Sequence, residues 1–131
     1  MDVWILRYPE RRHRTGAPRK VIVLRRTEEG EETELETLEV EMRSAPLQDV
    51  AQAQIAKGRT RLVLDLIHEK HMDSSDLAQT LEAFKQAGAL SAELVIANPN
   101  PKIKEIFRIT HLDQVMGLFD SVDAAAEHFA S

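Results

Sequence analysis

Hydrophobic and polar residues follow two different periods along this chain. A period of two is typical of a strand with one buried face, and apolar residues every three or four positions are typical of a helix that packs on one side. Short apolar runs bounded by proline, glycine or polar residues indicate further strands. These patterns predict strands at residues 3–6, 21–24, 38–42, 61–67, 93–97 and 118–119.

Apolar stripes at helical spacing follow four of these segments, and each stripe has a start or stop signal. Proline fits the first position of a helix, a short polar side chain caps its N–H groups, and glycine ends it. The helices are therefore predicted to begin at Pro46, after Asp73, at Pro101 behind Asn100, and after Asp120 or Ser121, with Gly58 and Gly88 ending the first two.

The order of elements from residue 38 onward is β-α-β-α-β-α-β-α, after an N-terminal β region. Such alternation predicts an α/β fold, a mixed sheet with helices packed on it and right-handed crossovers. The run "RLVLDLI" at 61–67 is apolar throughout, which indicates a central strand covered on both faces. We expect one domain over residues 1–131, with these core residues: Leu62, Leu64, Leu66, Leu81, Phe84, Val95, Ile106 and Phe107.

The net charge of −5 hides an uneven distribution. Residues 1–26 carry eight of the seventeen basic residues, and a predicted loop in this segment contains Arg11, Arg12 and Arg14. Residues 27–42 carry eight acids and no base. The basic loop lacks interleaved aromatic residues, so nucleic-acid binding is not expected. We interpret the split as pairing across strands, with "KVIVLRR" antiparallel to "LETLEVEM". Residues 1–37 form the N-terminal β region.

Several classes of chemistry are excluded or disfavoured by what the chain lacks. It has no cysteine, which rules out disulfides and thiolate ligands, and no apolar run approaches the roughly 20 residues of a membrane-spanning helix. A cytoplasmic protein without membrane insertion is expected. No Gly-x-Ser-x-Gly elbow or glycine-rich phosphate loop is present, so neither an enzyme nor a cofactor is predicted. Asp65, His68, His71 and Asp73 can ligate metals, but their spacing gives them no common face, and no metal site is predicted.

The stretch "HMDSSDLAQT", residues 71–80, places two serines between two aspartates immediately before a helix. Asp73 and Asp76 can form a reciprocal cap at its first turn. A serine at that position can also accept a phosphate, which would meet free N–H donors and the positive end of the helix dipole. Residues alone leave a structural cap and a phosphorylation site both open.

This stretch and the chain after it resemble the STAS domain family, which includes the anti-sigma-factor antagonists. The loop pattern Asp-Ser-Ser/Thr-Gly-Leu-Gly is matched at Asp73, Ser74, Ser75 and Leu77 and replaced at Asp76 and Ala78. A later pattern, a proline-led helix running into Thr-Gly-Leu and then a valine and a phenylalanine, is matched except that His111 replaces its glycine. The resemblance covers about residues 60–129, and the matches to the later pattern are Pro101, Ile103, Thr110, Leu112, Val115 and Phe119.

The resemblance implies a non-enzymatic regulator that binds an anti-sigma factor with a kinase-type ATP site and is switched by phosphorylation of Ser74. The partner-binding residues would be Asp73, Ser75, Asp76, Leu77 and Lys85. At ~7 Å, Asp76 would repel each phosphate charge by roughly 0.6 kcal/mol in water and about 2.4 at a dielectric of 20. This leaves an alternative: an unphosphorylated STAS docking subunit of a transporter ATPase or of a larger signalling complex. The sequence gives no oligomeric state.

Overall fold

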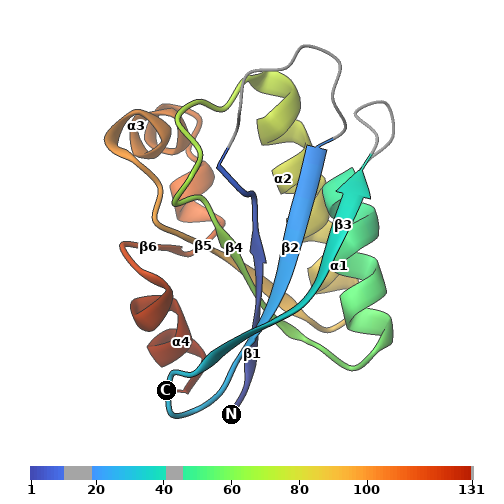
Figure 1. Ribbon diagram of the computed structural model, residues 1–131. Helices are drawn as coiled ribbons and strands as arrows, with labels where there is room; N and C mark the ends of the chain where they lie inside the picture. The colour runs from blue at the N-terminus through green and yellow to red at the C-terminus, as the bar shows by residue number, and fades with distance from the viewer. Residues whose placement is uncertain (11–18, 41–45, 131) are drawn as a thin grey trace.

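A computed structural model describes residues 1–10, 19–40 and 46–130, and within them six strands form one sheet in the order β3-β2-β1-β4-β5-β6 (Figure 1). The strands are β1 (Val3–Arg7), β2 (Arg19–Arg26), β3 (Glu32–Val40), β4 (Arg61–Asp65), β5 (Glu93–Ala97) and β6 (Leu118–Phe119). The helices are α1 (Pro46–Ala56), α2 (Ser74–Ala89), α3 (Pro101–Ile109) and α4 (Val122–Ala130), with a short 3-10 turn, η1 (Leu112–Gln114), after α3.

The sheet combines an antiparallel half with a parallel half. β2 runs antiparallel to both β1 and β3, whereas β1, β4, β5 and β6 run parallel to one another. β4 lies between β1 and β5, inside the sheet as its apolar sequence predicts. The mixed sheet and the β-α-β-α-β-α-β-α order after the N-terminal β region are both confirmed.

Apolar side chains fill a layer on each side of the sheet, because alternate residues of each strand point to opposite faces. Leu62 and Leu64 of β4 belong to a cluster that also contains residues of α1, α2 and α3. Val63 points the other way, into a smaller cluster with Val122 and Ala125 of α4. Figure 1 shows α1 and α2 together and α4 on its own. Among the described helices, α4 is therefore the one that covers this face of the sheet.

The first two helices end in the same hydrogen-bond pattern, but only one of them at the predicted glycine. Gly58 has φ +81° and follows α1, where the Arg59 amide donates to the Gln54 carbonyl at 3.1 Å. Gly88 lies inside α2, and the expectation that it ends the helix was wrong. Ser91 takes the left-handed position instead, with φ 60°. The Ala92 amide then bonds the Ala87 carbonyl, so the carbonyls that a helix end leaves free are satisfied without a glycine.

Five of the eight predicted core residues are buried, and Leu81, Phe84 and Ile106 are only partly buried. The reason is that small side chains occupy the buried positions of α2, which are Thr80, Ala83 and Ala87. Leu81 and Phe84 therefore lie at the flank of the layer. The confirmed core residues are Leu62, Leu64, Leu66, Val95 and Phe107.

Four strands differ in length from their predictions, and of these β1 is longer by one residue and β2 by two residues at each end. β3 begins at Glu32, before the predicted 38–42, because it pairs with the whole of β2. Its register shifts where Val23 opposes Glu36 and Leu24 opposes Glu34, which leaves Leu35 as a bulge. β4 ends at Asp65 rather than at residue 67. Of the other predicted positions, Met42 and the basic residues Arg11, Arg12 and Arg14 lie outside the described part of the chain.

Replacing Phe107, which is fully buried on the inner side of α3, should create a cavity. We expect Phe107→Ala to lower the free energy of unfolding by about 3–5 kcal/mol, and Phe84→Ala to lower it by less because that ring is partly exposed. Urea denaturation of both variants measures the difference. Equal losses would contradict the assignment of the core.

Glycines at positions 78 and 111 should have opposite effects. His111 is left-handed, with φ 60°, and a side chain there costs about 1–2 kcal/mol, whereas Ala78 lies exposed within α2. After allowance for the greater freedom of glycine in the unfolded chain, His111→Gly should stabilise the protein by up to about 1 kcal/mol. Ala78→Gly should destabilise it by about 1 kcal/mol. Urea midpoints that move in the same direction would contradict this account.

Candidate functional site

The serine stretch lies where the chain leaves the carboxyl end of β4 and enters α2 (Figure 1). The loop between these elements, residues 66–73, lies beside the loop that leaves β5, because β4 and β5 are parallel neighbours. In open α/β sheets the loops at this edge are the usual binding surface. The predicted site residues are therefore at a position suited to recognition.

Asp73 and Asp76 form the reciprocal cap that their spacing predicts. The Asp76 amide donates to Asp73 Oδ1 at 2.8 Å, and the Asp73 amide donates to Asp76 Oδ2 at 3.1 Å. Asp73 has extended backbone angles, as an N-cap residue does, and Asp76 is the third helical residue. The departure from glycine at Asp76 is thus part of a rigid helix start.

Ser74 and Ser75 are the first two residues of α2, and both are exposed. The Ser75 hydroxyl accepts a long hydrogen bond from Gln79 Nε2, at 3.5 Å. The Ser74 hydroxyl has no hydrogen-bond partner within residues 1–10, 19–40 and 46–130. Ser74 is therefore accessible to another protein, and its hydroxyl need not break an internal bond to react.

The other two predicted partner-binding residues lie in different environments. Leu77 is partly buried and packs against the main core cluster, so it supports the helix start from beneath. Lys85 is exposed, 3.7 Å from Glu82, and lies about 16 Å along the helix axis from Ser74. The exposed residues at helical spacing between the two ends are Ser75, Ala78, Glu82 and Lys85. They give α2 a continuous solvent-facing stripe.

Asn100 fastens the loop before α2 to the start of α3. Its side-chain oxygen accepts the Ile103 amide at 2.8 Å, which is the cap that the sequence predicts. Its Nδ2 donates to the carbonyls of Glu69 at 3.2 Å and Lys70 at 3.0 Å. The second role could not be predicted, because backbone carbonyls of a distant loop leave no signal in the sequence.

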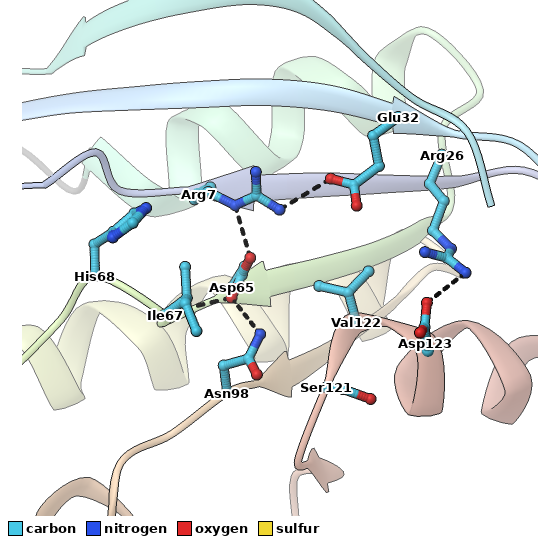
Figure 2. A pocket seen from close by; sticks show the side chains of 10 residues that line it. All are labelled: Arg7, Arg26, Glu32, Asp65, Ile67, His68, Asn98, Ser121, Val122 and Asp123. Atoms are coloured by element: carbon cyan, nitrogen blue, oxygen red, sulfur yellow. Dashed lines mark hydrogen bonds and ion pairs between the residues drawn. The ribbon is translucent and has the colours of Figure 1, made fainter.

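Asp65 is the centre of a polar network that the sequence also does not reveal (Figure 2). Its carboxylate is 1% exposed and accepts hydrogen bonds from Arg7 Nε at 2.7 Å, the Ile67 amide at 3.1 Å and Asn98 Nδ2 at 2.9 Å. Arg7 also donates to Glu32 at 3.0 Å. The one available signal was an acid within an otherwise apolar strand.

Burial lowers the pKa of Arg7, but its hydrogen bonds to Asp65 and Glu32 outweigh burial, so the pKa lies above its ordinary value. Arg7 is therefore charged at every physiological pH. β1, β3 and β4 are joined through this one cation at the edge of the sheet that carries the loop before α2.

The four metal-capable residues noted in the sequence do not gather around a common point. Asp65 is occupied by its three donors, and His68 and His71 are exposed. Within the described part of the chain, no group of three or more His, Asp or Glu side chains could hold a metal ion. No helix built from those residues has the length and apolar character needed to cross a membrane.

Comparisons with known proteins agree with this architecture. The model of the STAS domain matches residues 23–125. "Putative anti-sigma factor antagonist BtrV" of Bordetella bronchiseptica is 34% identical over 77 residues, which cover 59% of this chain and 66% of that protein. A homologue from Thermotoga neapolitana with the same functional name is 24% identical over 71 residues, which cover 54% of this chain and 63% of that protein. These matches span just under two thirds of each relative.

A solved structure resembles the fold. The crystal structure of a "putative anti-sigma factor antagonist" from Thermotoga maritima aligns with a TM-score of 0.58 at 19% identity. The alignment covers 65% of this chain and 76% of that one. At this identity the likeness concerns the fold.

Removing the charge of Asp65 should loosen the edge of the sheet from which the loop before α2 departs. Asp65→Asn keeps the shape of the side chain but replaces one accepting oxygen by an NH2 group, which faces donors, and we expect a loss of about 2–4 kcal/mol in the free energy of unfolding. The exposed Glu127→Gln, with the same change of charge, should stay within about 0.5 kcal/mol of the wild type. Similar urea midpoints for the two variants would disprove a structural role for the network.

Proposed function

Because the chain belongs to the STAS domain family, we propose that it is a non-enzymatic anti-sigma-factor antagonist that docks a kinase-type anti-sigma factor at the start of α2 and is released when Ser74 is phosphorylated. The observation that carries the proposal is the position of Ser74. It is exposed at the first residue of α2, with no internal partner for its hydroxyl within the described residues. The antagonist names of the two relatives support the class of partner.

The proposed docking surface consists of Asp73, Ser74 and Ser75 together with the exposed stripe of α2 that ends at Lys85. The capping box and the Asn100 hydrogen bonds hold this surface in one conformation before the partner arrives. A surface ordered in advance loses little conformational entropy on binding. Docking therefore requires little movement of the domain.

Phosphorylation would act on this surface through charge and fit. A phosphate adds about −1.5 to −2 charges, beside the two capping aspartates. A partner that had packed closely against Ser74 would have to desolvate that charge or leave a gap. The expected result is weaker docking with an unchanged fold.

Asp76 favours a second candidate, a docking subunit that is never phosphorylated. Its carboxylate lies within the first turn of α2, where the resembled pattern has glycine, and it opposes the negative charge of a phosphate. Such a subunit would belong to a transporter ATPase or to a larger signalling complex. The two candidates share the docking surface and differ only in the switch.

We expect the kinase-type anti-sigma factor from the same cell, with ATP, to add one phosphate to the wild type and to Ser75→Ala, and none to Ser74→Ala. Intact-mass spectrometry measures the adduct. Asp76→Asn should be phosphorylated faster than the wild type, because it removes the charge but keeps an oxygen that can accept the Asp73 amide. This variant is preferable to Asp76→Gly, which would also weaken the cap.

Isothermal titration of the same partner with each unphosphorylated variant separates docking from the switch. Binding without any phosphate adduct would leave the unphosphorylated docking subunit as the function. An adduct that persists in Ser74→Ala would refute the assignment of the phosphoacceptor. A partner that binds the wild type and a Lys85→Glu, Ser75→Arg double variant equally well would refute the surface.

A further inference from the structure

A pocket of about 400 Å³ opens on the α4 side of the sheet, next to the loop that leads to α2 (Figure 2). Arg7 and Glu32 line it from β1 and β3, Asp65 from the end of β4, and Val122 and Asp123 from the start of α4. The pocket also includes Ile67 and His68, the second and third residues of that loop. The pocket therefore lies at the start of the loop 66–73, and the proposed docking surface lies at its end.

The charges in the pocket are of both signs, and the negative sign is in surplus. Two arginines face three carboxylates, which leaves a net charge of −1 with His68 counted as neutral. Arg7 is held by both Asp65 and Glu32, and Arg26 Nη2 lies 2.7 Å from Asp123. Both resident cations are therefore already neutralised, and the carboxylates of Glu32 and Asp123 retain room for a further donor.

Arg26 offers little to an incoming anion. Its side chain is 13% exposed, and its Nε is buried, with no acceptor among the described residues. Arg26 does line the pocket, but its Nη2 is already paired with Asp123 there. The turn after Arg26 adds the exposed acids Glu28, Glu29 and Glu31, so the potential at this side of the pocket is negative.

Apolar walls accompany this negative charge. Ile67 is 53% exposed, unusually for a large apolar side chain, and Val122 lies at the pocket between Asp65 and Arg26 in Figure 2. A planar guanidinium on an aliphatic stem suits such a site, because it is weakly hydrated and bonds carboxylates in a fork. An ammonium ion would lose more hydration on entering.

We propose that this pocket receives an arginine side chain of the protein that docks at α2. The inference rests on the proposed docking function, since it extends the contact surface from Ser74 around the loop to the α4 face. It adds a requirement for the partner, which must present an arginine near the residues that cover α2. The pocket would then contribute selectivity between partners through charge and shape.

The test uses the protein alone with a small probe, so that it does not depend on the partner. Nα-acetyl-arginine amide should produce saturable changes in the methyl resonances of Ile67 and Val122, measured by NMR. Nα-acetyl-citrulline amide has nearly the same shape without the charge, and it should bind about tenfold more weakly, the ratio that a difference of about 1.4 kcal/mol gives.

Glu32→Gln and Glu34→Gln form the matched pair of variants. Both remove one charge from the same face of β3, but only Glu32 lines the pocket. We expect Glu32→Gln to weaken binding of the arginine probe about tenfold and Glu34→Gln to leave it nearly unchanged, with Asp123→Asn as a second pocket variant. Thermal melts of all three establish that they are folded.

Two outcomes would overturn the inference: no saturable change at Ile67 and Val122, or equal effects of Glu32→Gln and Glu34→Gln, which would indicate general attraction by an acidic surface. Either result would leave docking at α2 intact, because that contact is measured by titration with the anti-sigma factor. Conversely, loss of docking in the Ser74 region with normal probe binding would refute the proposed function and retain an arginine site.

Discussion

The buried carboxylate of Asp65 is the constraint on which the structure at the carboxyl ends of β1 and β4 depends. A charge with 1% exposure must be fully bonded, and its three donors come from β1, from the loop after β4 and from the loop after β5. The bond to the Ile67 amide fixes the direction in which the chain leaves β4. Asn100 holds Glu69 and Lys70 of the same loop, and the cap of Asp73 and Asp76 then fixes the start of α2, where Ser74 lies.

Features set by neighbouring residues could be predicted from the sequence. The cap at Asp73 and Asp76, the cap at Asn100 and the glycine stop at Gly58 each involve groups within a few positions of one another, and all three are confirmed. The alternation in β3 and the apolar run of β4 likewise give the sheet its strands. Local chemistry and periodicity were sufficient for these features because each element and its cap are formed by residues that are close together in the sequence.

The rest depended on contacts between residues far apart in the chain. Arg7 and Asp65 are 58 positions apart, and Asp65 and Asn98 are 33 apart, so no local pattern announces their hydrogen bonds. The prediction of which α2 residues are buried was wrong for a related reason. Helical spacing identifies the inner side of the helix, but the short distance to the sheet leaves room there for alanines rather than for Leu81 and Phe84. The serine stretch was singled out from its residues, the resemblance proposed Ser74 as the phosphoacceptor, and no sequence pattern predicted the pocket.

β3, nine residues long, is an edge strand of the sheet, and no other strand of the described part of the chain pairs with its outer side. Such an edge can template growth into fibres when copies of a chain meet side by side. Two features oppose this: the bulge at Leu35 interrupts the straight row of donors and acceptors, and four glutamates would be brought near those of a second copy. Charge repulsion and the bulge therefore both disfavour the pairing of two copies through this strand.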